Sequence, residues 1–258
     1  LRRQGLEVVV TAFTNRAVRV VRGYLNAVPG QGFVRTLTTS TLLGFRELPP
    51  AGKKPPRFEK IKPAALEGVD VVVVDEASML PPEHFEAFEQ ERESRRAMGK
   101  PLWVIYVGDP AQLPPVGIAA GKLSPAMELP EGRIARLTTV MRTGGAVLDA
   151  ATSVRSAKPG AAICFKPASS SGTTVVVHGN RQMARRTAKQ LVDQLASEFR
   201  ILAWTNQAVD DWNRVCRNHD LGADAPPFVV GERLITRAPI WDFDDISDPG
   251  ASPICANG

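Results

Sequence analysis

The sequence has few cysteines and no long apolar run, and each shortage excludes a class of protein. Its three cysteines, Cys164, Cys216 and Cys255, lie far apart and form no C-x-x-C pair. This spacing argues against a disulfide framework and against a zinc site, and it favours a reducing, cytoplasmic setting. No apolar segment is long enough to cross a membrane, and no cleavable signal is visible.

A phosphate-binding loop is also missing. The pattern G-x-x-x-x-G-K-[ST] occurs nowhere in the 258 residues. The stretch GIAAGKLS at 117–124 resembles it, but its spacing is one residue short. Leu123 also occupies the position at which Ser or Thr must bind Mg²⁺. Because the chain begins without methionine and runs at once into a strand-like segment, we interpret it as part of a longer protein.

Acidic residues are scarce at the start of the chain, although the overall net charge is only +5. Residues 1–60 contain 11 Lys or Arg and 3 acidic residues, whereas residues 61–130 contain 6 Lys or Arg and 11 acidic residues. A basic first quarter indicates a polyanionic partner, although a solvated basic surface explains it equally well.

Short Val/Ile-rich runs alternate with segments of helical periodicity along most of the chain. Apolar runs without polar alternation are typical of parallel strands that helices cover on both faces. We therefore predict an α/β fold with two domains, over residues 1–143 and 144–258, and a surface insertion at 44–66. The predicted strands include LEVVVTA (6–12), VDVVVVDE (69–76), PLWVIYVGD (101–109), RIARLTTV (133–140), TTVVVH (173–178) and RILAW (200–204).

A seven-residue repeat links the two predicted domains. AFTNRAV at 12–18 and AWTNQAV at 203–209 each follow an apolar run and open a predicted helix, which indicates duplicated domains. The matched pairs are Phe13 with Trp204, Thr14 with Thr205, and Asn15 with Asn206. The two aromatic residues either stack on a base or fill the core, and we favour the core for both.

The run VVVVDE ends in two adjacent acids, Asp75 and Glu76. An unpaired buried carboxylate is unfavourable, so the pair is expected where the strand emerges, next to a positive charge. One acid suits a Mg²⁺ ion that also binds the phosphates of a nucleoside triphosphate, and the other suits a base that deprotonates the attacking water. Solvated acids also end many strands, so this signal alone is weak.

The next strand carries a second polar group at its end. WVIYVGDPAQLPPVG places Gly108, Asp109 and Gln112 after the strand, and two prolines stiffen the loop that follows. A glutamine amide both donates to a terminal phosphate and accepts from the attacking water. Gln112 is therefore a candidate sensor of the γ-phosphate.

DEASM, GDPAQLPPV and LTTVMR resemble motifs II, III and IV of superfamily 1 DNA helicases, specifically the RecD-like branch that includes the Dda helicase. TAFTNRAV is similar to motif Ia, TTSTLL to motif Ib, and the region 199–217 to the second motor domain of the Dda type. The resemblance implies two RecA-like P-loop NTPase domains, both incomplete here. It also implies a cytoplasmic protein of a bacterial or phage-infected cell that works with replication or recombination proteins.

The resemblance also implies roles for single residues. Asp75 would hold Mg²⁺, Glu76 would be the catalytic base, and Gln112 would contact the γ-phosphate of ATP, with Asp109 beside the nucleotide. Arg142 would be the arginine finger, reaching the nucleotide from the side of the second domain. The residues expected along the single-stranded DNA are Thr11, Thr14, Asn15, Thr38 and Thr41, and by the repeat also Thr205 and Asn206. Helix capping is the alternative for Thr14.

The chain departs from the family pattern in three respects. The phosphate-binding loop is absent, Ser40 stands where motif Ib usually has histidine, and motifs V and VI are not found. We therefore expect the parent protein to be an ATP-dependent DNA helicase, with 5′→3′ movement implied by the family, and the chain as given not to hydrolyse ATP. The alternatives are a RecD-type subunit of a multi-subunit exonuclease and a degenerate, non-enzymatic single-strand-binding module.

Overall fold

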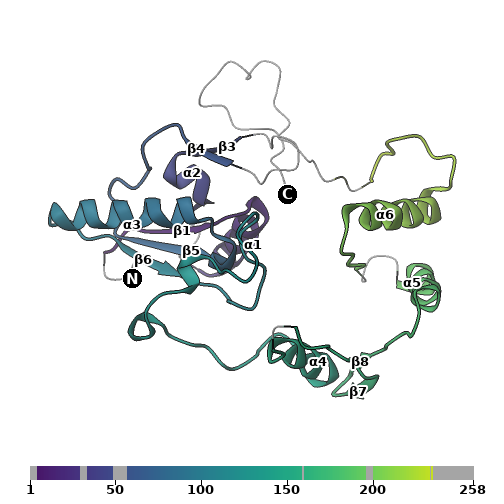
Figure 1. Ribbon diagram of the computed structural model, residues 1–258. Coiled ribbons are helices and arrows are strands. Elements are labelled where there is room, and N and C mark those ends of the chain that lie inside the picture. The colour runs from purple at the N-terminus through teal and green to yellow at the C-terminus, as the bar shows by residue number, and fades with distance from the viewer. Residues whose placement is uncertain are drawn as a thin grey trace. The chain divides into compact units, whose positions relative to one another are not determined.

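The computed structural model describes residues 5–29, 34–48, 57–158, 160–195, 200–232 and 234. Among these residues the chain forms two compact units, the first ending at Arg136 and the second running from Leu137 to Leu234 (Figure 1). No helix in these described ranges has the length and apolar character needed to span a bilayer.

The first unit is built on a four-stranded, fully parallel sheet in the order β2-β1-β5-β6. Its strands are β1 (Val8–Ala12), β2 (Arg35–Thr38), β5 (Val71–Asp75) and β6 (Trp103–Tyr106). In register, Ala12 at the end of β1 pairs with Thr38 of β2 and with Asp75 of β5. The carboxyl ends of these three strands therefore meet at one edge of the sheet, where polar groups of the predicted site follow them. The predicted α/β class with a parallel sheet is confirmed.

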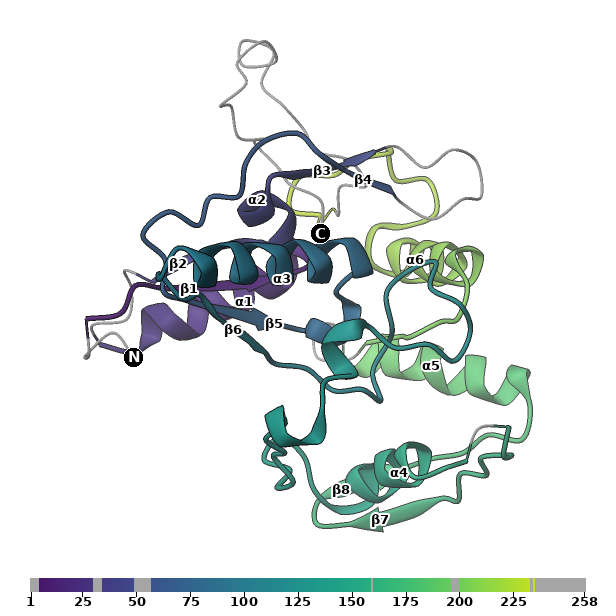
Figure 2. The same cartoon turned by 60° about the vertical axis from the view of Figure 1, so that its left-hand side comes forward.

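Helices cover both faces of this sheet, as the apolar strands require (Figure 2). The face that carries Val9, Val72 and Val74 packs against Phe88 and the neighbouring apolar residues of α2 and α3 in one core cluster. Helix α1 contacts β1 and β2 and buries Val18. The helices of the first unit are α1 (Asn15–Ala27), α2 (Thr39–Leu43), α3 (Pro82–Ala97) and the short 3-10 helices η2 (Ala77–Met79), η3 (Pro125–Met127) and η4 (Glu131–Arg133).

The predicted surface insertion contains an antiparallel hairpin of β3 (Phe45–Leu48) and β4 (Arg57–Lys60). Residues 49–56 of the insertion lie outside the described residues. Gly44 begins the hairpin with φ +77°, and a Cβ atom there would lie 2.2 Å from the carbonyl oxygen of Lys62. Only glycine therefore fits at this turn.

The second unit contains α4 (Gly145–Arg155), an antiparallel hairpin of β7 (Ala168–Ser170) and β8 (Thr173–Val175), α5 (Arg181–Leu195) and α6 (Asn206–Leu221). Its described residues form no parallel sheet, contrary to our prediction for the second domain. Neither predicted strand, at 133–140 or at 200–204, is formed: Arg133 ends η4 and the other residues of both runs are coil. Leu137 and Leu202 are 99% and 94% exposed. A strand needs a hydrogen-bonded neighbour, and no described segment of this unit pairs with either run.

Candidate functional site

The two acids Asp75 and Glu76 lie where β5 leaves the sheet, and both are half-buried. The backbone N–H of Glu76 donates to Oδ1 of Asp75 over 3.0 Å. Glu76 itself adopts the left-handed conformation, with φ +52° and ψ +39°. This region is uncommon for a residue other than glycine, and such residues concentrate at functional sites. The turn directs the chain away from the strand directly after Asp75.

The loop after β6 lies directly against this turn. The N–H of Ala77 donates to the carbonyl of Val107 over 2.9 Å, and the N–H of Val107 donates to the carbonyl of Val74 over 2.8 Å. A Cβ atom on Gly108 would lie only 2.9 Å from the backbone nitrogen of Ser78. Only glycine permits this approach, so the backbone after β5 and the backbone after β6 pack directly against each other.

Gln112 is held by a small turn of this second loop. Oδ1 of Asp109 accepts the N–H of Ala111 over 3.0 Å, and the carbonyl of Asp109 accepts the N–H of Gln112 over 2.9 Å. The side chain of Gln112 is exposed and has no hydrogen bond with any described residue. Pro115, three residues on, is buried and fixes the end of the loop. Gln112 therefore has an amide available for a ligand.

The donor set at this edge fits a hard divalent cation. Oδ2 of Asp75 and the carboxylate of Glu76 make no hydrogen bond or ion pair with other described residues. The described residues contain no cluster of three or more potential metal ligands. A single available carboxylate suits Mg²⁺, which keeps several waters and takes further oxygens from substrate phosphates. Asp75 is the residue that would hold it.

The stretch at 117–124, which resembles a phosphate-binding loop, ends in a serine that stabilises the fold. Ser124 is fully buried, and its hydroxyl donates to the carbonyl of Leu80 over 2.7 Å. Its Oγ also accepts the N–H of Ala126, which caps the 3-10 helix η3. A committed, buried hydroxyl is not available to bind Mg²⁺ or phosphate.

Two of the residues predicted to contact DNA cap helices at the same edge of the sheet. Thr14 precedes α1, and its Oγ1 accepts the N–H of Ala17 over 3.2 Å. Thr38 precedes α2, and its Oγ1 accepts the N–H of Thr41 over 3.2 Å and lies 2.9 Å from the hydroxyl of Thr41. An accepting hydroxyl keeps its own proton for a further acceptor, so capping and phosphate contact are compatible. Asn15, exposed, begins α1 directly after the cap.

Thr11 differs from these residues. It is 1% exposed, and its hydroxyl donates to the carbonyl of Leu37 on β2 over 2.7 Å. This bond ties two strands together inside the unit. The prediction that Thr11 contacts DNA is therefore corrected: its side chain belongs to the interior of the sheet, where the β-branched Thr suits a strand.

The second unit carries the other predicted site residues. Thr205 caps α6 in the way that Thr14 caps α1, with Oγ1 accepting the N–H of Ala208 over 3.2 Å, and Asn206 opens the helix. Arg142 is exposed in the coil before α4. The roles of these residues at the nucleotide or on DNA stay predictions.

A buried histidine that the sequence does not single out lies beside α2. His84 on α3 is fully buried, and its Nε2 lies 3.0 Å from Oγ of Ser40 on α2. Burial lowers the pKa of His84 from 6.5 to about 4. Phe13, predicted to fill the core, packs edge-on against this ring with centroids 5.8 Å apart, whereas its counterpart Trp204 is 98% exposed. A single histidine in an acidic helix gives no sequence signal of such a contact.

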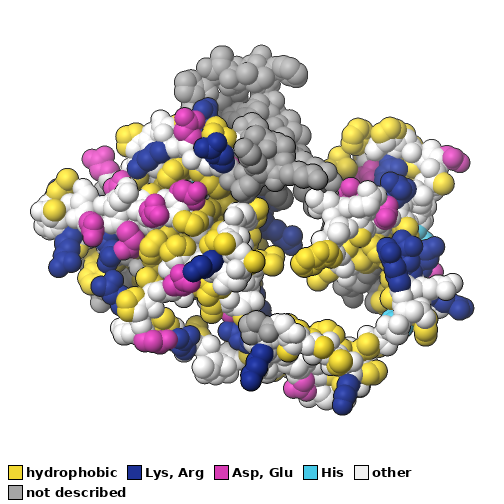
Figure 3. Space-filling model, viewed as in Figure 1, with side chains coloured by type: hydrophobic (Ala, Val, Ile, Leu, Met, Phe, Trp, Pro, Cys, Tyr) yellow, Lys and Arg dark blue, Asp and Glu magenta, His cyan; other side chains and the backbone are white. Residues whose placement is uncertain are grey.

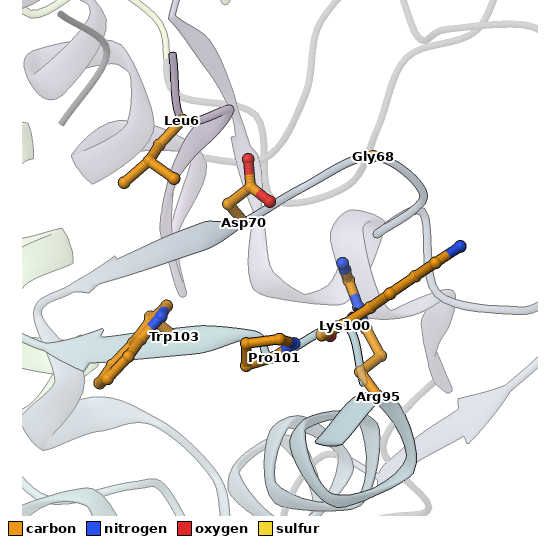
Figure 4. Close-up of a pocket in the computed structure, with 7 residues that line it drawn as sticks. All are labelled: Leu6, Gly68, Asp70, Arg95, Lys100, Pro101 and Trp103. Atoms are coloured by element: carbon orange, nitrogen blue, oxygen red, sulfur yellow. Dashed lines mark hydrogen bonds between the residues drawn. The ribbon is translucent and has the colours of Figure 1, made fainter. Parts of the chain in front are cut away.

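A pocket lies at the opposite, amino end of the strands (Figure 4). Two of its charged side chains are used within the fold: Asp70 accepts the N–H of Glu7 over 2.8 Å, and Arg95 donates to the carbonyls of Leu66 and Val69 over 2.9 and 2.6 Å. We therefore place the functional site at the carboxyl edge and not here. The residues that line the pocket are Leu6, Gly68, Asp70, Arg95, Lys100, Pro101 and Trp103.

A protein-family model described as an AAA domain matches residues 1–175. Because the match covers more than half of the chain, the chain belongs to this family of AAA domains, which is the Pif1/RecD-like family. The predicted resemblance is confirmed at this level. The narrower assignment to the RecD or Dda type stays a prediction.

Solved structures show a weaker similarity, and no match is found among curated proteins. A structure of two coordinating Pif1 helicases at forked double-stranded DNA is 22% identical, with a TM-score of 0.29, over 43% of this chain and 25% of that chain. Bacteroides Pif1 bound to single-stranded DNA is 22% identical, with a TM-score of 0.28, over 45% of this chain and 25% of that chain. Bacteroides Pif1 in complex with ADP-AlF4 is 20% identical, with a TM-score of 0.29, over 45% of this chain and 25% of that chain. The chain spans about a quarter of the length of each of these structures. TM-scores this low support no conclusion about the fold.

Proposed function

We propose that the chain is part of an ATP-dependent DNA helicase that moves along single-stranded DNA and unwinds duplexes. Membership of the Pif1/RecD-like family of AAA domains supports a nucleotide-driven motor. The observation that carries the proposal is the packing of the Asp75–Glu76 turn on the Gly108 loop, through the Ala77–Val107 hydrogen bond. This packing brings two acids and an available glutamine amide to one edge of a parallel sheet.

Each group has a role that its surroundings allow. Asp75 holds Mg²⁺ beside the triphosphate, and Glu76 accepts the proton of the attacking water. Gln112 contacts the γ-phosphate from its exposed turn, which Asp109 stabilises. Mg²⁺, when bound, neutralises charge on the phosphate oxygens. Arg142 of the second unit supplies the arginine that stabilises the transferring phosphoryl group.

The strand of DNA runs over capped helix ends. Thr38 and Thr41 at α2 and Thr14 and Asn15 at α1 lie beyond strands that end beside Asp75, so DNA contact and hydrolysis share one edge of the first unit. Small hydroxyl and amide groups suit phosphate contacts without base selectivity. The second unit contributes the matching pair Thr205 and Asn206.

Helix α5 adds positive charge to the second unit (Figure 3). Four of its residues are basic, and the guanidinium of one, Arg185, lies 5.9 Å from the ring centre of Trp212 on α6. A basic helix that contacts α6, the helix capped by Thr205, is consistent with a polyanionic partner. The RecD-like resemblance implies 5′→3′ movement, a cytoplasmic setting, and replication or recombination proteins as further partners.

A strand-displacement assay tests this function in the full-length protein. Duplexes with a single-stranded tail at either the 5′ or the 3′ side are incubated with protein, Mg²⁺ and ATP, with a non-hydrolysable ATP analogue as the control. We expect displacement from the 5′-tailed duplex only, and none by Asp75→Asn, because the amide removes the charge that holds the cation.

Three outcomes contradict parts of the proposal. Displacement without hydrolysable nucleotide excludes an ATP-driven motor. Activity that requires a co-purified subunit assigns the protein to a multi-subunit exonuclease of the RecD type. Tight binding to the tail with neither hydrolysis nor displacement identifies a single-strand-binding module.

A further inference from the structure

His84 occupies an aromatic cage in the first unit. The ring is fully buried. Its centroid lies 4.7 Å from those of Phe45 and Phe58 and 5.8 Å from that of Phe13. These phenylalanines come from β3, from β4 and from the junction between β1 and α1. One histidine on α3 therefore touches the elements that surround the predicted DNA-contact helices.

The ring has a single polar partner among the described residues. Nε2 lies 3.0 Å from Oγ of Ser40, and Nδ1 is buried without a hydrogen bond. A buried N–H without an acceptor is rare in folded proteins, so we assign the proton to Nε2, which donates to Ser40. Burial lowers the pKa of His84 to about 4, so the ring is neutral at pH 7.

Ser40 belongs to α2, a helix too short to be stable in isolation. Helix α2 has five residues, far fewer than an isolated helix needs for stability. Its position therefore depends on tertiary contacts, among them the buried side chains of Thr39, Leu42 and Leu43. The N–H of Ala65 also donates to the carbonyl of Leu42 over 2.7 Å, and His84 adds the bond to Ser40. The same helix carries the linked hydroxyls of Thr38 and Thr41 at its start.

We propose that Ser40 and His84 are a pair of positioning residues that fixes α2 against α3 and so sets the Thr38–Thr41 cap for binding single-stranded DNA. This role rests on the proposed function, because it assigns the cap to the DNA track. Helix α3 begins at Pro82, shortly after the Asp75–Glu76 turn. The pair therefore connects the helix that contacts DNA with the helix that follows the catalytic acids.

Variants of the full-length protein separate this role from simple packing. Ser40→Ala removes the acceptor, and His84→Leu removes the donor while it keeps the cage apolar. His84→Gln places an amide N–H near the position of Nε2 and is the rescue variant. Ser94→Ala, at an exposed serine on the same helix as His84, is the matched control.

Two quantities are measured well below the unfolding temperature of every variant. They are the Kd for fluorescent oligothymidine by anisotropy at fixed salt, and the kcat for ATP hydrolysis at saturating oligothymidine. We expect Ser40→Ala and His84→Leu each to raise Kd about fivefold, the effect of one net hydrogen bond, with kcat unchanged. The double variant should be no weaker than either single variant, and His84→Gln and Ser94→Ala should bind like the parent.

Several results overturn the assignment. If unfolding temperatures fall but Kd stays at the parent value, the pair only stabilises the fold. If the two single effects add in the double variant, Ser40 and His84 do not act as a pair. If the parent binds oligothymidine but hydrolyses no ATP, the proposed helicase function fails, and the pair is judged by Kd alone. If the parent does not bind oligothymidine, both proposals fail.

Discussion

The two copies of the repeat, residues 12–18 and residues 203–209, have the same cap and different surroundings. Thr14 has φ −105° and ψ 148°, and Thr205 has φ −116° and ψ 150°. In both, Oγ1 accepts the N–H three residues on at 3.2 Å. The threonine carbonyls accept the N–H groups of Val18 and Val209, four residues on, at 3.1 and 3.0 Å. The repeat therefore specifies how each helix begins.

What precedes the cap differs. The first copy follows β1, which is paired on both sides by parallel strands, and its Phe13 packs against Phe58 and His84. The second copy follows coil, and its Trp204 is 98% exposed. A cap forms from residues a few positions apart, whereas a buried strand needs partners from elsewhere in the chain. The short motif therefore determines the helix cap in both copies, whereas the buried strand before the cap forms only where other segments of the chain pair with it.

The largest effect is expected at Arg142, the proposed arginine finger. Arg142→Ala in the full-length protein should lower kcat for ATP hydrolysis about a thousandfold, because an arginine finger neutralises charge that develops on the transferring phosphoryl group. Steady-state hydrolysis at saturating oligothymidine measures this, with Arg214→Ala on α6 as the control. Normal turnover by Arg142→Ala would show that Arg142 has no role in hydrolysis and is only a residue of the coil before α4.

The aromatic cage exists only at the first copy, so its pH response should be confined to the first unit. The folded state holds the pKa of His84 at about 4, below its ordinary 6.5, so the unfolded chain binds the proton more tightly. The contribution of His84 to the free energy of unfolding should be constant above pH 6.5, fall by about 3 kcal/mol between pH 6.5 and 4, and then level off. Urea unfolding across this range measures the fall.

His84→Leu provides the control for this pH dependence. Without the imidazole, the part of the fall that belongs to this window should disappear, while the response to carboxylate protonation at lower pH remains. An unchanged slope in His84→Leu means that another group controls the stability of the first unit between these pH values.

Truncating the two matched aromatic residues should affect stability differently. Phe13 is half-buried, so Phe13→Ala should lower the free energy of unfolding by about 2 kcal/mol, less than for a fully buried phenylalanine. Trp204→Ala should change it by less than about 0.5 kcal/mol because the side chain is exposed. Urea unfolding at pH 7 compares them. An equal loss in both variants shows that Trp204 is part of a core, as the sequence analysis predicted.

The smallest effect concerns the threonines themselves. Thr14→Ala and Thr205→Ala should each weaken binding to oligothymidine by about 0.5–1.5 kcal/mol, the contribution of one net hydrogen bond. Thr14→Asp and Thr205→Asp keep a capping acceptor but lose the donor and add a negative charge, so they should bind DNA more weakly while the helix stays capped. Anisotropy titration at fixed salt tests all four.

The pair of threonines also tests the duplication. If each copy holds one phosphate, both alanine variants should uncouple ATP turnover from strand displacement more than they slow turnover. If Thr205→Ala binds and unwinds like the parent while Thr14→Ala does not, the second copy is only a helix cap, and the symmetry between the two copies is wrong.

Much of the first unit's site could be predicted from sequence because its signals are local. A run of valines ending in Asp75 predicts a buried strand and the point at which it emerges, and Gly108 after the next strand predicts a tight turn. The parallel order of the sheet then brings both ends together. Thr11 was assigned to the DNA track with Thr14 and Asn15 of the same motif, which are exposed, whereas its own side chain lies in the interior of the sheet.

Other features depend on contacts that sequence patterns do not encode. The bond between Ser40 and His84 joins residues 44 positions apart, and neither residue type signals the other. The strand predicted at 200–204 has the right composition, yet it forms no ladder because composition does not supply a neighbour. Local chemistry could therefore be predicted, whereas long-range pairing could not.

The most direct test of the account is ATP hydrolysis by the full-length protein with and without oligothymidine, compared with Glu76→Gln. We expect single-stranded DNA to stimulate ATP turnover by the parent. We expect no turnover by Glu76→Gln, which should still bind nucleotide and oligothymidine because only the base is lost. DNA-stimulated hydrolysis by Glu76→Gln at the parent rate would contradict the assignment of the Asp75–Glu76 turn as the catalytic centre.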